Sequence, residues 1–345
     1  MTDTVFLTEK SGSKLRMWGG FVCNRSCLVF FLLNLIIIQS FIYFQEQSKC
    51  QEFTAKLHSI LDSQEDVYSL INSFMKHIEK NGVDSIMGGD NKPIIYAITP
   101  TFARPVQKAE LTRLSQTFLH IPNFHWIVVE DAIEKTQLVT KFLQQSGLAY
   151  THLAAQTPSN YKLGRNDPNW KKPRGVEQRN AALKWLREKM SPSDNGIVYF
   201  ADDDNTYSLK LFKEMAKIQK VGVWPVGLVG GLMVEKPICD NVTNKVVDFN
   251  AAWKPDRPFP IDMAGFAVKL KLILENKGAQ FSYDVQGGYQ ESEILRQIVT
   301  RDELEPLADF CTKVYVWHTR TEPPQLNVEQ LLKKKGKRSN IGIEV

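Results

Sequence analysis

The residues best suited to chemistry follow one apolar run, Gly-Ile-Val-Tyr-Phe-Ala at 196–201. A short apolar run bounded by turn-forming residues is typical of a strand buried on both faces. Three consecutive carboxylates come next, Asp202, Asp203 and Asp204, and they would repel one another unless a positive group lay among them. Open α/β sheets bind ligands at the carboxyl ends of their strands, and divalent cations prefer oxygen ligands. The run therefore predicts a site for a metal ion or a polar ligand.

The three carboxylates are not equivalent, because alternate side chains of an extended chain point to opposite sides. We expect Asp202 and Asp204 on one side and Asp203 on the other, so that one or two bind a metal ion while a neighbour meets a different group. A simpler interpretation is that Asp204-Asn205-Thr206 caps a helix predicted over 208–220. A cap needs only one Asp, so the triplet favours the ligand site.

Positive charge is predicted near this acidic site. An apolar strand over 313–317 ends in His318 and Arg320, and the segment 171–180 contains two lysines and two arginines. Asp131 follows another predicted strand, so three strand ends place polar groups at one rim of the sheet. Cations beside a carboxylate–metal site indicate an anionic substrate such as a diphosphate. A surface ion pair is the alternative for His318 and Arg320.

Strands and helices alternate from Lys92 onward, as in βαβ units with a parallel sheet and right-handed crossovers. Strands are predicted at 93–99, 125–129, 149–153, 196–200 and 313–317, helices at 106–119, 135–145, 176–189, 208–220 and 294–299, and a β-like, glycine-rich segment at 221–235. Three prolines make 252–260 a loop. No G-x-G-x-x-G or G-x-x-x-x-G-K-[ST] motif occurs in the sequence, which argues against dinucleotide enzymes and P-loop NTPases.

The amino-terminal part predicts a membrane anchor. Residues 1–26 are polar with several basic residues, and residues 27–44 are almost wholly apolar and uncharged. This length is at the short end of what spans a bilayer, and the flanking charges predict a cytoplasmic tail and a lumenal remainder. A cleaved signal peptide is the alternative, but the apolar segment ends in Phe-Ile-Tyr-Phe instead of a small-x-small site. We expect an uncleaved, single-pass type II anchor.

Residues 45–91 are predicted to form a stem between the anchor and the catalytic domain. Apolar residues between Phe53 and Ile78 alternate in spacings of four and three, which is a heptad pattern with one polar interruption. Cys50 lies on the same seam, so a parallel two-stranded coil would place two copies of it face to face in an oxidising lumen. We expect a homodimer with an interchain disulfide at Cys50; a single amphipathic helix packed on the catalytic domain, residues 92–345, is the alternative.

Composition sets further limits on function. The 345 residues have a net charge of +5 and five cysteines, none in a C-x-x-C pair, so a structural zinc site is not expected. No nucleic-acid-binding module is recognisable, and the basic run at 333–338 is typical of a solvated tail. Asn241-Val-Thr is a glycosylation sequon on the predicted lumenal side.

Several longer motifs resemble one enzyme family. They are Ile98–Arg104, Val128–Asp131, Pro173–Asn180, Phe200–Tyr207, Pro258–Ala267 and Val316–Glu322. These motifs resemble the animal β1,3-glucuronyltransferases, and the similarity runs from Pro93 to Val345. Arg-Gly-Val-Glu-Gln-Arg-Asn and the Lys-rich tail look most like the glucuronyltransferase I branch, which adds glucuronic acid to the Gal-Gal-Xyl linker of proteoglycans. The branch that acts on Galβ1-4GlcNAc termini is the alternative.

The resemblance implies a GT-A type α/β fold with a Rossmann-like mixed sheet, a Golgi location, and inverting transfer from UDP-glucuronate with Mn²⁺. It implies Asp204 as the metal ligand. The donor-binding positions it implies are Pro100, Phe102, Asp131, Arg174, Arg179, Asp202, Asp203, His318 and Arg320. Phe102 stands where the family often has Tyr, so a stacking face is kept and a hydroxyl is absent.

The resemblance also implies the acceptor side of the site. Both Glu291 and Glu293 are candidates for the general base from the residues alone, and the match of Gln-Glu-Ser selects Glu291. The acceptor-binding positions it implies are Glu235, Trp253, Arg257 and Asp262. Val328 departs from the Gln of the glucuronyltransferase I branch, which leaves the acceptor open. A metal-dependent carbohydrate-binding protein without turnover is the non-enzymatic alternative.

Overall fold

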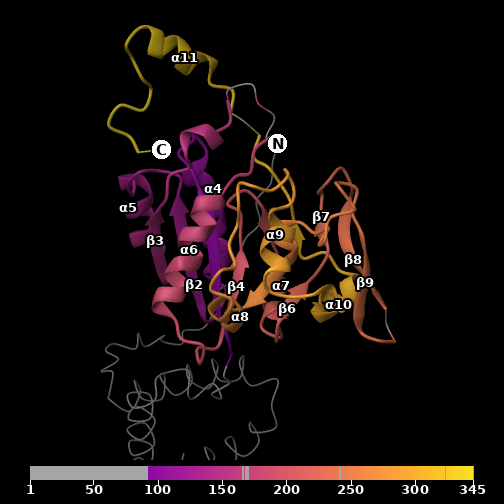
Figure 1. Ribbon diagram of the computed structural model, residues 1–345. Helices are drawn as coiled ribbons and strands as arrows, with labels where there is room; N and C mark the ends of the chain where they lie inside the picture. The colour runs from indigo at the N-terminus through magenta and orange to yellow at the C-terminus, as the bar shows by residue number, and fades with distance from the viewer. Residues whose placement is uncertain (1–91, 165–166, 168–170, 241, 323, 345) are drawn as a thin grey trace, which may run out of the picture. The chain divides into compact units, whose positions relative to one another are not determined.

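The apolar run that precedes the acidic triplet forms the central strand of a mixed sheet in the computed structural model (Figure 1). The structure describes residues 92–164, 167, 171–240, 242–322 and 324–344, all of which belong to the unit Asn91–Val345. The predicted anchor at 27–44, the stem with Cys50 and the sequon residue Asn241 lie outside the described residues. In the described part of the chain, we find no helix with the length and apolar character needed to cross a membrane.

The central strand, β4 (Gly196–Phe200), is the fourth of seven strands in the order β11-β6-β10-β4-β1-β2-β3. Its neighbours on one side are β1 (Ile94–Thr101), β2 (Phe124–Glu130) and β3 (Tyr150–Ala154), all parallel to it. On the other side β10 (Phe266–Lys269) is antiparallel to both β4 and β6 (Val221–Val223), and β6 pairs in parallel with β11 (Leu304–Pro306). The mixed sheet of the prediction is therefore confirmed, and β10 is the strand that makes it mixed.

Helices cover both faces of this sheet, and alternate strand residues pack on opposite faces. One face packs against α4 (Gln107–Phe118), α5 (Gln137–Gln145) and α7 (Leu209–Met215). The other face packs against α6 (Val176–Lys189), α8 (Leu270–Glu275) and α9 (Gln290–Arg296). In β4, Ile197 and Tyr199 contribute to the first layer, whereas Val198 and Phe200 contribute to the second.

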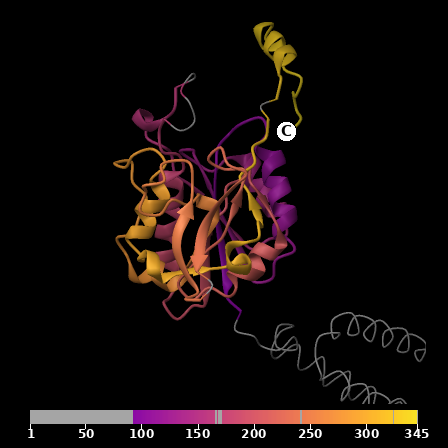
Figure 2. The ribbon, with the colours of Figure 1, turned by 90° about the vertical axis from the view of Figure 1, so that its right-hand side faces the viewer.

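A second sheet of five strands, in the order β5-β12-β7-β8-β9, was not foreseen from the sequence. It consists of β5 (Thr206–Tyr207), β12 (Val316–Trp317), β7 (Val226–Gly227), β8 (Val234–Asp240) and β9 (Lys245–Asn250). The hairpin of β8 and β9 lies on the side of the domain away from β2 and β3, and it faces the viewer in Figure 2. Three of the five strands have only two residues, which is too short for a periodic pattern.

The helix after the acidic triplet is shorter than predicted. Ser208 is its N-cap, and its side chain accepts a hydrogen bond from the Lys210 amide. The interpretation of Asp204-Asn205-Thr206 as the cap is therefore wrong, because β5 lies between the triplet and the helix. The helix ends at Met215 instead of residue 220, because the chain must turn before β6 begins.

The remaining elements are short. They are the 3₁₀ turns η2 (Ser159–Tyr161), η3 (Met263–Gly265) and η4 (Arg301–Glu303), the turn α10 (Ala308–Cys311) and the helix α11 (Asn327–Lys334). All four residues of α10 have positive φ, and the turn places the buried Cys311 thiol against the Val223 carbonyl and against the Cys239 thiol. Both cysteines are free.

Candidate active site

The acidic loop connects the two sheets. After β4 the Ala201 amide still bonds to the Ile98 carbonyl, and the chain then turns into β5, which pairs with β12. The hydroxyl of Thr319, just after β12, donates to the Asp204 carbonyl at 2.7 Å. His318 therefore lies near the acidic triplet, as predicted, but the strand before it, β12, belongs to the second sheet and not to the sheet of β4.

The three carboxylates meet different partners, as the alternation predicted. Asp202 lies 2.6 Å from an Arg179 nitrogen of α6, whereas Asp203 lies 2.7 Å from an Arg104 nitrogen beside α4. Burial raises the pKa of Asp203 to about 6, although the Arg104 charge opposes this shift. The pKa of Asp204 is raised by burial and then by the nearby Asp202 charge. Asp204 is thus a carboxylate with an adjacent negative charge, an arrangement that a cation would relieve.

The donor set around Asp204 fits a hard divalent ion that takes most of its ligands from a substrate. Within the described residues no cluster of three or more His, Cys, Asp or Glu side chains is arranged to hold a metal ion. Mg²⁺ and similar ions are commonly bound through one or two carboxylates together with substrate phosphates. Asp204, with Asp202 nearby, matches that pattern and does not match a metal site built wholly from protein ligands.

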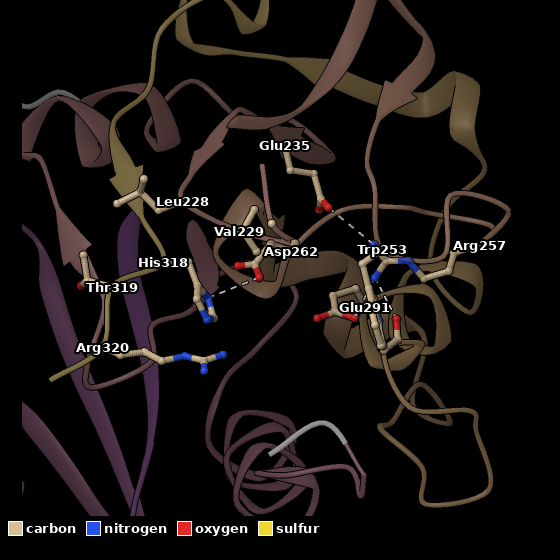
Figure 3. A pocket seen from close by; sticks show the side chains of 13 residues that line it. Leu228, Val229, Glu235, Trp253, Arg257, Asp262, Glu291, His318, Thr319 and Arg320 are labelled. Carbon is tan, nitrogen blue, oxygen red and sulfur yellow. Dashed lines mark hydrogen bonds and ion pairs between the residues drawn. The ribbon is translucent and has the colours of Figure 1, made fainter. Parts of the chain in front are cut away.

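A cavity of about 680 Å³ opens next to the acidic loop (Figure 3). Seven of the predicted site residues line it: Glu235, Trp253, Arg257, Asp262, Glu291, His318 and Arg320. In Figure 3, His318 and Arg320 lie on one side of the cavity and Trp253, Arg257 and Glu291 on the other. These residues come from β8, the loop after β9, η3, α9 and the segment after β12. Tertiary structure therefore brings together residues that span 86 positions of the sequence from Glu235 to Arg320.

Arg257 lies between two buried carboxyl groups of this cavity. Its nitrogens are 3.9 Å from Glu235 and 3.7 Å from Glu291. Burial raises the pKa of Glu235 to about 8 and that of Glu291 to about 7, and the Arg257 charge opposes both shifts. Near neutral pH, Glu235 is therefore mostly protonated, whereas Glu291 is present in both its protonated and its ionised form. The other candidate base, Glu293, forms a two-bond ion pair with Arg296 along α9.

His318 is oriented by a buried carboxylate. Its Nδ1 lies 3.5 Å from an Asp262 oxygen, and Asp262 also accepts a hydrogen bond from the Ala264 amide. This contact with Asp262 raises the pKa of His318, although burial opposes the shift. Burial works to raise the pKa of Asp262, but His318, the Ala264 amide and the Arg257 charge together outweigh it, and the pKa is lowered. His318 is thus favoured as a cation on the cavity wall.

Trp253 contributes a large apolar surface to the cavity, and its side chain is 40% exposed. Gly288 supports it from behind, with φ at +83°. A Cβ atom at Gly288 would clash with the indole nitrogen of Trp253, so a glycine is needed there for both conformation and space. An exposed indole face of this kind suits stacking against a sugar ring.

The remaining predicted donor positions lie along the carboxyl ends of β1 and β2. The Phe102 side chain is 50% exposed, and the Arg104 guanidinium lies 4.6 Å from its ring centroid. Both oxygens of Asp131 accept hydrogen bonds from Thr157. These positions lie at the rim of the sheet on the side of the parallel strands.

Two further donor positions meet at the start of α6. Pro100 lies against Gly175, and the exposed Arg174 precedes that glycine. The Arg174 carbonyl accepts a bond from Arg179. Gly175 has φ at +71°, and a Cβ there would clash with the Arg179 guanidinium. Pro100, Arg174 and Arg179 are therefore grouped, whereas none of them lines the cavity.

Sequence reasoning assigned no role to several residues that shape the site. Arg104, Thr157, Gly288 and Thr319 all contact predicted site residues. Arg104 stands in a motif that carried the family resemblance, so its position in that motif was a usable signal. Thr319 likewise stands in the Val316–Glu322 motif, whereas the contacts of Thr157 and Gly288 join segments distant in sequence and had no local signal.

Comparisons with known proteins agree with these observations. The family model described as glycosyltransferase family 43 matches residues 114–322. Galactosylgalactosylxylosylprotein 3-beta-glucuronosyltransferase I of Drosophila melanogaster is 59% identical over 261 residues, covering 74% of this chain and 85% of that protein. The Caenorhabditis elegans protein sqv-8, with the same enzyme description, is 55% identical over 71% of this chain and 69% of its own. Galactosylgalactosylxylosylprotein 3-beta-glucuronosyltransferase 1 of Homo sapiens is 55% identical over 69% of this chain and 72% of its own.

Among solved structures, Staphylococcus aureus TarS residues 1–349 in complex with UDP-GlcNAc superposes with a TM-score of 0.43 at 16% identity. The overlap covers 70% of this chain and 64% of that one.

Proposed function

The chain belongs to glycosyltransferase family 43, and from that premise we propose that it transfers glucuronic acid from UDP-glucuronate to the terminal galactose of the Gal-Gal-Xyl linker of proteoglycans. One observation supports this proposal most strongly. A single cavity has a buried carboxyl group with a pKa near neutrality, Glu291, on one side and the cations His318 and Arg320 on the other. A displacement at a sugar carbon needs a base and an electrostatic partner for the leaving group at such opposed positions.

Glu291 is the general base of the proposed reaction. Its carboxylate takes the proton from the 3-hydroxyl of the acceptor galactose as that oxygen bonds to C1 of glucuronic acid. The bond between C1 and the phosphate oxygen breaks on the opposite face, and UDP leaves. One displacement inverts the α-linked donor into a β-linked product. Burial keeps the pKa of Glu291 at about 7, so the base is available and strong at neutral pH.

The leaving diphosphate is met by positive charge from the chain. The Asp262 contact raises the pKa of His318 and so favours its cationic form, and Arg320 is the second basic residue on the same wall. Both charges are in place before reaction, which avoids the cost of reorganising solvent around the departing UDP.

We propose a GT-A type site in which Asp204 holds Mn²⁺, since its carboxylate lies beside Asp202 and its pKa is raised by burial and by that neighbour. Bound there, the ion supplies Lewis-acid stabilisation of the diphosphate. Asp202 lies toward the donor sugar, paired with Arg179, and Asp203 toward the nucleoside. Phe102, Pro100, Asp131 and Arg174 form the uridine side, as the rim positions of β1, β2 and α6 suggest.

The acceptor lies against Trp253, with its hydroxyl groups near Glu235, Arg257 and Asp262. The indole supplies the stacking surface, and the buried polar groups of the other three residues supply hydrogen bonds. Protonated Glu235 acts as a donor toward an acceptor oxygen, because burial raises its pKa to about 8.

The proposed location and assembly of the protein are based mainly on its amino-terminal sequence. We propose a type II Golgi membrane protein with a cytoplasmic tail, an anchor at 27–44, a dimerising stem linked through Cys50, and a lumenal catalytic domain glycosylated at Asn241. Electrophoresis without reductant tests the dimer: a covalent dimer that disappears in a Cys50→Ser variant is expected, and a monomer in the wild type contradicts the disulfide.

The proposed activity is tested with UDP-glucuronate and Mn²⁺ on two acceptors, Galβ1-3Gal-Xyl and Galβ1-4GlcNAc. We expect product on the first and much less on the second, and a loss of about 100-fold or more in kcat for Glu291→Gln. Glu293→Gln is the matched control, because Glu293 is two residues away and paired with Arg296, and it should keep full activity. Failure of the wild type to form product refutes the function, and preference for Galβ1-4GlcNAc refutes the proposed acceptor. Equal rates for wild type and Glu291→Gln refute the assignment of Glu291 as the general base.

A further inference from the structure

Arg104 lies in the loop between β1 and α4 and contacts two separate parts of the donor side. Its Cζ lies 4.6 Å from the centroid of the Phe102 ring, and its Nη1 donates to the Phe102 carbonyl at 3.1 Å. Its Nη2 lies 2.7 Å from an Asp203 oxygen. One guanidinium therefore connects the exposed aromatic ring to the acidic loop.

The Phe102 ring is half exposed, and the Arg104 cation lies over it. An aromatic ring with an open face is a stacking platform for a planar ligand such as a nucleobase. A cation over the ring and a hydrogen bond to the same residue's carbonyl both restrict its movement. A ring ordered in advance lowers the entropy lost when a ligand binds.

A second carboxylate keeps Arg104 in place. Glu110 of α4 is 2% exposed and also pairs with Nη2 of Arg104, so two buried carboxylates share one cation. The planar guanidinium has five donors and serves these two carboxylates, a carbonyl and a ring face at once. A lysine ammonium is a point charge on a flexible stem and cannot make all four contacts.

We propose that Arg104 is a positioning residue for the nucleoside half of the donor, holding the Phe102 ring and Asp203 in the arrangement that a uridine diphosphate requires. The inference rests on the proposed function in that the donor is a UDP-sugar. Because Arg104 is not among the residues that line the cavity, its loss should weaken donor binding and leave acceptor binding unchanged.

The test compares Arg104→Lys with wild type in UDP binding by calorimetry with Mn²⁺ present, and in KM for donor and acceptor separately. We expect UDP to bind about tenfold more weakly, with a similar rise in the donor KM and little change in the acceptor KM or kcat, since a lysine loses the cation–π contact and cannot pair with both carboxylates at once. Equal UDP affinity in the two proteins overturns the proposal. If the wild type itself does not bind UDP, the proposed function fails instead.

Arg187→Lys is the matched control. Arg187 donates to the carbonyls of Ile273, Asn276 and Ala279, contacts that are structural and outside the site. This substitution should lower the unfolding temperature without changing UDP affinity. Comparison of the two variants therefore separates the general effect of losing a half-buried guanidinium from a role of Arg104 in positioning.

A double-mutant cycle tests the connection to the ring. In a Phe102→Leu background, Arg104→Lys should cost less UDP affinity than it costs in wild type, because the ring that it positions is gone. Equal costs in both backgrounds overturn the positioning role. If Arg104→Lys does not fold, the pair Arg104→Gln with Glu110→Gln replaces it, since that pair leaves the net charge of the cluster unchanged, and the same loss is expected.

Discussion

The charge of Arg257 should set the pH range over which the protein works. Its guanidinium lies 3.7 Å from the Glu291 carboxylate and opposes the shift that burial imposes, so the pKa of Glu291 is about 7 and not higher. Replacing Arg257 by Met removes the charge and keeps an unbranched side chain. We expect the pKa of Glu291 to rise and the acid limb of the pH–rate profile to move to higher pH.

The size of the shift follows from the distance. Two unit charges 3.7 Å apart interact by about 1 kcal/mol at the dielectric constant of water and by about 4 kcal/mol at an effective value near 20. One pKa unit corresponds to about 1.4 kcal/mol, so the midpoint should rise by about one to three units. The base must be unprotonated to act, so at pH 7 the rate falls by about fivefold or more, and part of it returns as the pH is raised.

The assay is kcat/KM for glucuronyl transfer measured from pH 5 to 9, because this parameter reports the pKa values of the free enzyme. Arg301→Met is the control. Arg301 donates to the Arg257 and Pro258 carbonyls of the same loop, and it faces neither Glu235 nor Glu291 in the described contacts. The Arg301→Met substitution should loosen the loop without moving the pH midpoint of the acid limb.

Two results would refute this reasoning. A wild-type acid limb near pH 4.5, the ordinary range for a glutamic acid, would show that burial does not raise the pKa of the base. A folded Arg257→Met protein with an unmoved midpoint would show that Arg257 does not act on it electrostatically.

Three further predictions concern stability, the acceptor and the metal. The pKa of Glu235 is raised from 4.5 to about 8 in the folded state, so its contribution to stability is fully present below pH 4.5 and is lost as the pH rises from there to about 8. Glu235→Gln should therefore unfold at the wild-type temperature at pH 4 and at a temperature higher by roughly 10 °C at pH 9, and equal unfolding temperatures at both pH values contradict the assignment. Gly288→Ala should displace Trp253 and raise the acceptor KM by about tenfold with the donor KM unchanged, whereas Gly278→Ala, which meets open space, should do neither; an unchanged acceptor KM shows that the indole is not the stacking surface. Asp204→Asn should abolish the strengthening of UDP binding by Mn²⁺ in calorimetry, and an undiminished Mn²⁺ effect places the ion elsewhere.

Local sequence determined the central strand and much of the layer around it. The apolar run at 196–200 forms β4, and α6 has the predicted bounds, because strand burial and helix periodicity depend on residues close together in the chain. The separation of Asp202 from Asp203 was also predicted from the alternation of an extended chain, although both residues lie just beyond the end of β4. Neighbouring residues are sufficient for these features.

The site residues were identified through motifs shared with a family, and such motifs do not explain why a given position has its role. Residue types could not distinguish Glu291 from Glu293, and the structure places the first in the cavity and the second in an ion pair on α9. The difference arises from which face of the helix is directed at the cavity, because residues two apart in a helix lie on opposite faces. That depends on how α9 packs against the rest of the domain.

Only the tertiary structure decided the chemistry available to these groups. The two-residue strands β5 and β12 have no pattern that predicts their pairing, yet this pairing brings His318 beside the acidic loop. The pKa of Glu291 is raised by burial, and this shift is limited by the charge of Arg257, which lies 34 positions earlier in the chain. Sequence determined which carboxylates and cations the protein has, because residue type is local. Their distances and exposure to water, and hence their protonation, were decided by contacts between segments far apart in the chain.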